Sequence, residues 1–266
     1  MVNTYFGYFL KVIKYYISFV KELQDAKASY SRIEKIKNYD TIKSGNEEIT
    51  KFEKLSAEHI SFFYQVKGKK NLILNKFTYD FLKGNKYSII GPNGCGKSTL
   101  LKIITGLYTD IEGVVTINGV RIGKLDAEKL RKERFSVVPQ RIYVSSENVI
   151  DYLKKGLERS TDELYRLLES DNEKLSEYVK TIKNCADKGC ENLSGGELRK
   201  INLWMAFHKS ADILILDEPT MELDKESKRE LFEYLDCDIQ DRLLIVITHD
   251  RELMELSDYI VDLGTG

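Results

Sequence analysis

The spacing of hydrophobic residues along this chain predicts alternating β-strands and α-helices. From residue 57 to residue 138, short apolar or alternating segments have the pattern of strands. These predicted strands are Ile60–Tyr64, Leu72–Leu74, Phe77–Phe81, Tyr87–Ile90, Val114–Ile117 and Ser136–Val138. Residues 141–190 are charged, and their leucines are spaced for one buried helical face. Other segments predicted to be helical are Leu100–Leu107, Gly195–Lys209, Lys225–Leu235 and Arg251–Leu256.

Two later apolar runs indicate the fold class. Ile213–Leu216 and Leu243–Thr248 are apolar almost throughout, which is typical of strands that are buried on both faces of a mainly parallel sheet. Because helices alternate with these strands, we predict an α/β fold.

Length, charge and cysteine content narrow the class of protein. The chain has 266 residues, enough for a large domain with its own core. Its 41 basic and 42 acidic side chains give a net charge of −1, which argues against a strongly basic nucleic-acid-binding protein. The four cysteines form no C-x-x-C pair and no signal peptide is evident, so we expect reduced thiols in a cytosolic compartment.

A glycine-rich segment lies between a predicted strand and a predicted helix. It matches the phosphate-binding pattern G-x-x-x-x-G-K-[ST] through Gly91, Pro92, Asn93, Gly94, Cys95, Gly96, Lys97, Ser98 and Thr99. Glycines let backbone N–H groups approach phosphate oxygens, and the helix N-terminus adds partial positive charge. We expect Lys97 to bridge the β- and γ-phosphates and Ser98 to ligate Mg²⁺. Cys95 is interpreted as a small residue that fills the loop.

Two carboxylates end the apolar run Ile213–Leu216. A buried parallel strand delivers Asp217 and Glu218 to the carboxyl edge of the sheet, where open α/β sheets bind ligands. Asp217 is a candidate Mg²⁺ ligand, and Glu218 is a candidate general base for an attacking water.

A second glycine segment precedes a predicted helix, with a serine as candidate N-cap. Its residues are Leu193, Ser194, Gly195, Gly196 and Glu197.

These three motifs resemble those of the nucleotide-binding domain of ABC ATPases, and more narrowly of ABC exporters. Gly91–Thr99 resembles Walker A, Leu214–Glu218 resembles Walker B and Leu193–Glu197 resembles the family signature. The resemblance covers about residues 57–263, which is most of the chain. It implies a P-loop NTPase fold with a mainly parallel core sheet, an antiparallel β subdomain and a helical subdomain at about 141–209. It also implies that the domain binds ATP and Mg²⁺ and hydrolyses ATP, with each ATP held between Walker A of one copy and the signature of another.

The resemblance assigns roles to four further residues. Gln140 resembles the Q-loop residue that contacts Mg²⁺ or the attacking water, and His249 resembles the H-loop residue that contacts the γ-phosphate. Asp224 stands at the D-loop position, although this loop reads M-E-L-D where the family commonly has S-A-L-D. Tyr64 resembles the aromatic residue that stacks on adenine. The alternative for Tyr64 is packing in the core of its strand.

The N-terminal residues are predicted to form a separate element. Residues 1–40 have the composition of one long helix, and residues 41–56 form a polar linker. Met1–Val20 is crowded with aromatic and apolar side chains, yet Lys11 and Lys14 make it a poor membrane-spanning helix by itself. The resemblance implies the end of an exporter's last transmembrane helix. A soluble amphipathic helix that packs on the domain or on a partner is the alternative.

The sequence-based hypothesis is therefore an ATP-hydrolysing subunit of an ABC transporter, with export as the favoured direction. The implied partners are a second ABC ATPase domain, as a homodimer or a paired subunit, and a transmembrane domain at the cytoplasmic face of the cell membrane. No nucleic acid is implied. A soluble ABC ATPase of translation or DNA maintenance is less favoured, because such proteins usually carry two sets of motifs and this chain has one. A non-hydrolysing module is disfavoured because Lys97, Asp217, Glu218 and His249 are all present.

Overall fold

The computed structural model describes residues 45, 47–66, 69–144, 146–171, 173–237 and 241–264. The helix predicted over residues 1–40 lies outside these residues. Within the part that is described, no helix combines the length and the apolar character that a bilayer span requires.

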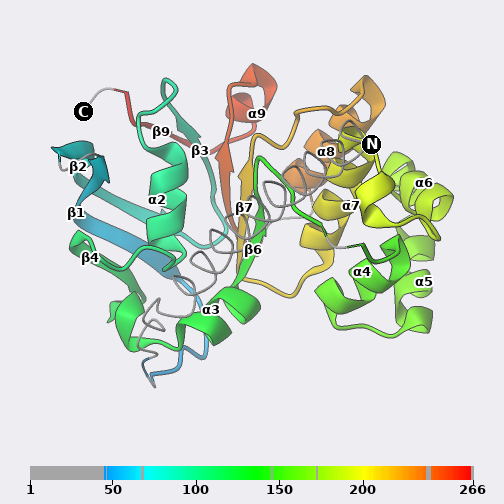
Figure 1. Ribbon diagram of the computed structural model, residues 1–266, viewed down its shortest axis with the longest axis horizontal. Helices are drawn as coiled ribbons and strands as arrows, with labels where there is room; N and C mark the ends of the chain where they lie inside the picture. Colours follow the sequence, from blue (N-terminus) through cyan, green and yellow to red (C-terminus); the bar gives the residue numbers. More distant parts are fainter. Residues whose placement is uncertain are drawn as a thin grey trace, which may run out of the picture. The chain divides into compact units, whose positions relative to one another are not determined.

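A five-stranded parallel sheet forms the centre of the described domain (Figure 1). Every neighbouring pair of its strands is parallel, so the predicted mainly parallel core sheet is confirmed. In spatial order the strands are β6 (Phe135–Val138), β7 (Ile213–Asp217), β8 (Leu243–Ile247), β3 (Lys86–Ile90) and β9 (Tyr259–Asp262). The edge strand β9 was not among the predicted strands, and only one of its four residues, Val261, is buried.

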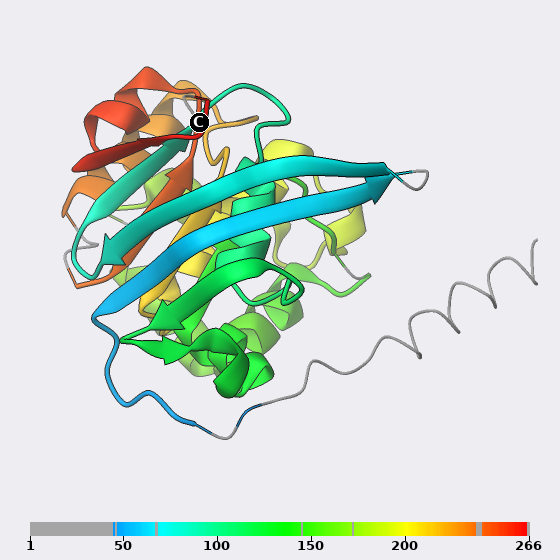
Figure 2. The ribbon, with the colours of Figure 1, turned by 90° about the vertical axis from the view of Figure 1, so that its left-hand side faces the viewer.

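A second sheet is antiparallel and has four strands (Figure 2). In spatial order they are β2 (Lys69–Leu82), β1 (Lys54–Val66), β4 (Glu112–Ile117) and β5 (Val120–Arg121). The segments Leu72–Leu74 and Phe77–Phe81, predicted as separate strands, both belong to β2. Register irregularities between β1 and β2 interrupt the alternation of their side chains, which explains the split prediction. Phe52, which precedes β1, is already 1% exposed, so core packing starts within the segment predicted as a linker.

The helices divide between the two faces of the parallel sheet. α2 (Lys97–Ile104) and α3 (Ala127–Arg134) pack with the antiparallel sheet in one hydrophobic cluster. The second cluster contains residues of α4 (Val149–Leu157), α5 (Thr161–Ser170), α6 (Ser176–Cys185), α7 (Gly195–His208), α8 (Lys225–Cys237) and α9 (Arg251–Glu255). Short 3₁₀ turns lie at Ile122–Lys124 and Cys190–Asn192. Figure 1 shows α2 and α7 on opposite sides of the sheet.

The continuous apolar strands serve both clusters. Along β7, Ile213 and Ile215 belong to the cluster with α2, while Leu214 and Leu216 belong to the cluster with α7. This division follows from the two-residue period of a strand. It confirms that the apolar run is a strand covered on both faces.

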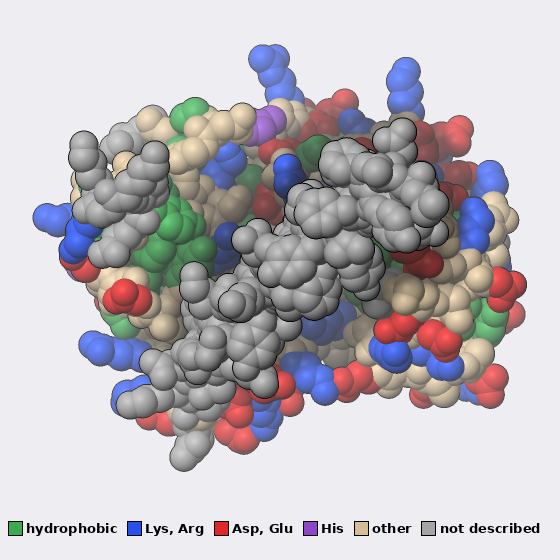
Figure 3. Space-filling model, viewed as in Figure 1, with side chains coloured by type: hydrophobic (Ala, Val, Ile, Leu, Met, Phe, Trp, Pro, Cys, Tyr) green, Lys and Arg blue, Asp and Glu red, His purple; other side chains and the backbone are tan. Residues whose placement is uncertain are grey.

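The described surface carries mixed charges. On the face in Figure 3, basic and acidic side chains of the described residues are interspersed. This distribution agrees with the net charge of −1.

Candidate functional site

Several of the residues predicted to bind or hydrolyse the nucleotide lie at the carboxyl ends of three parallel strands. The glycine-rich loop follows β3, Asp217 ends β7, and His249 stands two residues after β8. Because β3 and β7 both pair with β8, these ends lie along one edge of the sheet. Open α/β sheets bind ligands at this edge.

The loop after β3 has the backbone conformation of a phosphate cradle. Gly94 and Gly96 have φ angles of 85° and 106°, in the left-handed region that favours glycine. A Cβ on Gly96 would lie 2.9 Å from the side chains of Ile73 and Leu74, whereas a Cβ on Gly94 would meet no atom within 4 Å. Gly96 is also the N-cap of α2 and offers no side-chain cap, so the first N–H groups of this helix are available to an anion.

Lys97 folds back across this loop. Its Nζ donates hydrogen bonds to the carbonyl oxygens of Gly91, at 2.6 Å, and Pro92, at 3.1 Å. The ammonium group therefore lies over the glycine-rich segment, as binding to phosphate oxygens requires. Cys95 is half-buried as a free thiol, and its Sγ lies 2.8 Å from where a Cβ on Gly91 would stand.

Ser98 and Asp217 offer oxygen ligands to a hard cation. Asp217 is 8% exposed, and burial together with the charge of Glu218 raises its pKa. A hydrogen bond with Ser98 acts in the opposite direction, and it joins the two predicted ligands. A carboxylate beside a hydroxyl is a donor set that fits Mg²⁺.

Gln140, the third predicted Mg²⁺ ligand, is exposed in this structure. Its Nε2 donates to Sδ of Met221 at 3.6 Å. Among the described residues it has no hydrogen bond to Ser98 or Asp217. Gln140 therefore contacts Met221, which lies in the segment after β7.

Glu218 and His249 lie within reach of each other. Nε2 of His249 is 3.5 Å from Oε1 of Glu218, and the Glu218 side chain is mostly buried. The backbone N–H of Glu218 donates to the carbonyl of Ile247, while its φ of 49° is unusual for a residue other than glycine. Backbone strain of this kind is concentrated at functional sites.

The signature segment begins α7 with a capping box. Oγ of Ser194 accepts from the N–H of Glu197 at 3.3 Å, and Oε2 of Glu197 accepts from the N–H of Ser194 at 2.8 Å. Sγ of Cys185 and Nζ of Lys188 also donate to Glu197, at 3.2 and 3.4 Å. Neither partner was predicted, because both lie upstream of the motif and carry no pattern of their own.

We expect Glu197 to make stability depend on acid pH. The hydrogen bonds from Ser194 and Cys185 lower its pKa from 4.5 to about 2. The stabilisation is therefore complete above pH 4.5 and is lost as pH falls towards 2. In thermal unfolding followed by circular dichroism, Glu197→Gln should lower the Tm at pH 7 by more than at pH 3. An equal Tm difference at both pH values would contradict the assignment.

The segment after β7 is tied to the signature helix. Lys200 is only 8% exposed, and its Nζ lies 2.7 Å from Oδ2 of Asp224. Although burial opposes it, this hydrogen bond holds the pKa of Asp224 well below its usual range. Oδ1 of Asp224 accepts from the N–H of Ser227 at the start of α8. The two predicted regions therefore form one packed unit.

Tyr64 stands beside the phosphate loop within an aromatic group. Its hydroxyl lies 3.3 Å from Oγ1 of Thr99 and donates to the hydroxyl of Tyr108 at 3.3 Å. Its ring meets Phe62 edge-on at 5.0 Å, and Phe62 stacks on Tyr108 at 5.1 Å. Tyr108 was not predicted as a site residue, because a lone tyrosine after a helix has no local signal.

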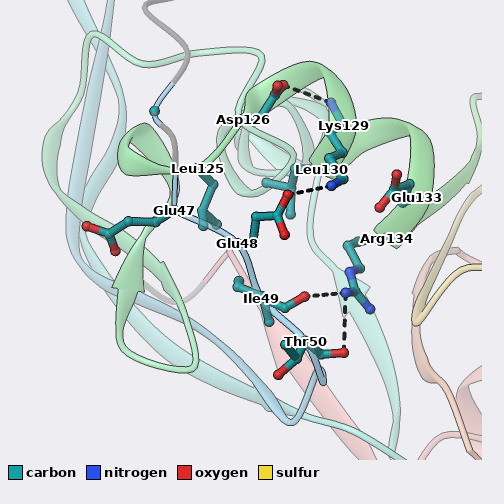
Figure 4. Close-up of a pocket in the computed structure, with 11 residues that line it drawn as sticks. Glu47, Glu48, Ile49, Thr50, Leu125, Asp126, Lys129, Leu130, Glu133 and Arg134 are labelled. Carbon is teal, nitrogen blue, oxygen red and sulfur yellow. Dashed lines mark hydrogen bonds and ion pairs between the residues drawn. The ribbon is translucent and has the colours of Figure 1, made fainter.

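One cavity lies away from this site. It measures about 400 Å³ and is lined by Gly45, residues 47–50, Leu125, Asp126 and part of α3 (Figure 4). Lys129 binds Glu48 at 2.6 Å, and Arg134 donates to the main-chain carbonyls of Ile49 and Thr50. The polar segment before β1 is therefore attached to α3, and none of the predicted site residues lines the cavity.

A glycine-rich phosphate cradle, a lysine above it and two carboxylates at the same sheet edge define an α/β domain for nucleoside triphosphates. A family profile described as ABC transporter matches residues 74–221. The chain belongs to the ABC transporter family and carries its ATP-binding ATPase cassette.

Proteins similar to this chain are consistent with membership of this family. The chain is 30% identical over 266 residues to the ATP-dependent lipid A-core flippase of Francisella novicida, covering 97% of this chain and 44% of that protein. It is 31% identical to the Microcin-J25 export ATP-binding/permease protein McjD of Escherichia coli, covering 80% of this chain and 36% of that protein. The chain thus spans less than half the length of these relatives.

The fold also matches solved structures. The structure of a bacterial Atm1-family ABC exporter with ATP bound has a TM-score of 0.73 and 20% identity, covering 91% of this chain and 43% of that one. Dimeric MJ0796, a bacterial ABC transporter cassette, has a TM-score of 0.67 and 22% identity, covering 79% of this chain and 95% of that one. The predicted ABC ATPase fold is confirmed, apart from the N-terminal helix.

Proposed function

We propose that this chain hydrolyses ATP as one of two paired cassettes and thereby powers transport, in the direction of export. One observation carries the proposal. The phosphate loop belongs to the α2 side of the sheet, whereas the signature residues begin α7 on the other side. A signature that acts on the nucleotide therefore has to come from a second copy or a paired subunit. Dimeric MJ0796 supports this arrangement.

Each residue of the site has a proposed role in hydrolysis. The backbone of the loop and Lys97 bind the β- and γ-phosphates. Ser98 and Asp217, with Gln140, would hold Mg²⁺, which neutralises charge on the phosphate oxygens when bound. Glu218 accepts the proton of the water that attacks the γ-phosphorus, while the bond from that phosphorus to the ADP oxygen breaks. His249 orients Glu218 and contacts the γ-phosphate.

The proposed partners and location follow from the relatives. These are named as a flippase and an export protein, and each is more than twice as long as the matched region. We propose that the cassette works with a transmembrane domain at the cytoplasmic face of the cell membrane. Residues 1–40 are proposed to be the end of the last transmembrane helix of that domain. Residues 41–56 would then link it to the cassette of residues 57–266, whose helical subdomain occupies about 141–209.

The test is the dependence of ATP hydrolysis on chain concentration. Phosphate release with Mg²⁺ should rise with the square of the chain concentration below the dimerisation constant, because two chains complete each site. Light scattering should show a dimer with ATP and a monomer without it. A rate per chain that is the same at all concentrations, from a monomer in ATP, would overturn the proposed pairing.

Removing the ring of Tyr64 is expected to weaken ATP binding. Stacking of a base on an aromatic ring contributes about 1–3 kcal/mol, or a factor of about 5 to 150 in affinity. Tyr64→Ala should show this loss in titrations with a fluorescent ATP analogue. Tyr64→Phe keeps the ring and loses only the bonds to Thr99 and Tyr108, so its affinity should stay within about threefold. Wild-type affinity in Tyr64→Ala would leave the ring as a packing residue.

A further inference from the structure

Arg199 is a buried cation in the signature helix α7. Only 3% of the Arg199 surface is exposed to solvent, and such complete burial is rare for arginine. The helix reads Glu197-Leu198-Arg199-Lys200 directly after the two glycines. None of the roles described above includes Arg199.

The guanidinium group of Arg199 bridges two main-chain carbonyls. Nη1 donates to the oxygen of Pro139 at 2.9 Å, and Nη2 donates to the oxygen of Gln140 at 2.6 Å. These two residues directly follow β6, so the contacts fix where the chain leaves the sheet. The buried Nε has no hydrogen-bond partner among the described residues. Only the two terminal nitrogens make these contacts, and both reach the same short segment.

The charge of Arg199 interacts with acidic residues at the end of β7 and just after it. Burial lowers its pKa, and the carboxylates of Glu222, Asp217 and Glu218 raise it. The two carbonyl groups accept from Nη1 and Nη2 but carry no net charge, whereas these three carboxylates favour the charged form of Arg199. Arg199 therefore contacts the segment of Gln140 and feels the charge of the carboxylates proposed to act on Mg²⁺ and water.

Other contacts join the same three segments around Arg199. Gln140 reaches Met221, and Lys200 pairs with Asp224. A Cβ on Gly196 would lie 2.7 Å from the main-chain oxygen of Glu222, so the start of α7 comes close to the backbone of this segment. The start of α7, residues 139–140 and residues 217–224 thus form one packed unit, with Arg199 inside it.

We propose that Arg199 is a positioning residue for ATP hydrolysis, because its bridge to the carbonyls of Pro139 and Gln140 holds Gln140 in place relative to Asp217 and Glu218. The inference rests on the proposed function. Arg199 acts through Gln140 and makes no contact with nucleotide itself. Its loss should therefore affect turnover far more than nucleotide affinity.

The test compares Arg199→Met and Arg199→Lys in the full chain. Methionine keeps an apolar stem and removes every donor, so kcat should fall at least about tenfold, since small misplacements of catalytic groups are costly. The Kd of a fluorescent ATP analogue should change by less than about twofold. Lysine restores a single cationic donor and should recover part of kcat. As a matched control, Arg229→Met removes an exposed arginine paired with Glu233 on α8 and should behave as wild type.

The single tryptophan of the chain, Trp204, lies buried in the same helix and reports its packing. Unchanged Trp204 emission in Arg199→Met, together with reduced kcat, supports the inference. Wild-type kcat in Arg199→Met would overturn it. So would a parallel loss of kcat, nucleotide affinity and native Trp204 emission, because that pattern is merely structural, or an Arg199→Lys variant no more active than Arg199→Met. A wild-type chain without ATP hydrolysis would instead overturn the proposed function, and the inference with it.

Discussion

Replacing Glu218 by glutamine is expected to abolish ATP turnover while leaving ATP binding intact. Glutamine matches glutamate in size and can keep a polar contact with His249, which lies 3.5 Å from Glu218. Its amide cannot accept the proton of the attacking water. A positioned general base contributes about 10²- to 10⁴-fold to a rate. We therefore expect kcat to fall at least about 100-fold.

The same variant should trap the paired state. If two cassettes close over ATP and hydrolysis reopens them, Glu218→Gln should remain dimeric in ATP by light scattering, while the wild-type dimer decays. Phosphate release measures the lost turnover. Glu233→Gln is the matched control, because Glu233 is an exposed acid on α8 and its side chain is 66% exposed. Turnover of Glu218→Gln at the wild-type rate would remove Glu218 from the role of base.

The features that could be predicted are those that depend on residues close together in the sequence. The run Ile213–Leu216 predicts a strand covered on both faces, since each side of it must be apolar, and the structure has this arrangement. The glycine-rich loop and Asp217 are likewise recognised locally, because the loop directly follows β3 and Asp217 ends β7. Parallel pairing of β3 and β7 with β8 then brings them to one edge without further information.

The features that escaped prediction depend on contacts between distant residues. Arg199 meets Gln140 across 59 positions, and Lys200 meets Asp224 across 24 positions. A single sequence contains no periodicity that marks such a pair.

The helix α3 was also missed, because its residues are mostly charged and only Ala127 and Leu130 are buried. Too few buried positions remain for a helical pattern to be recognised.

Replacing Lys97 by alanine is expected to remove productive ATP binding. The ammonium group already bonds the carbonyls of Gly91 and Pro92, so it is held above the loop in which the phosphates would lie. Hydrogen bonds to charged groups contribute about 1.5–3 kcal/mol, which corresponds to a loss of affinity of about 10- to 150-fold. Hydrolysis should fall further, because Lys97 also stabilises charge on the γ-phosphate during transfer.

Thermal unfolding with and without nucleotide separates this loss of binding from a loss of fold. A ligand at 100 times its Kd stabilises a protein by about 2.7 kcal/mol, so saturating ATP should raise the Tm of the wild-type chain by several degrees. Lys97→Ala should lose most of this shift, and its Tm without nucleotide should fall only slightly, since just two loop hydrogen bonds are lost. Lys132→Ala, which removes an exposed lysine paired with Glu158, is the control. An ATP-induced Tm shift in Lys97→Ala equal to that of the wild type would mean that the loop binds phosphate through its backbone alone.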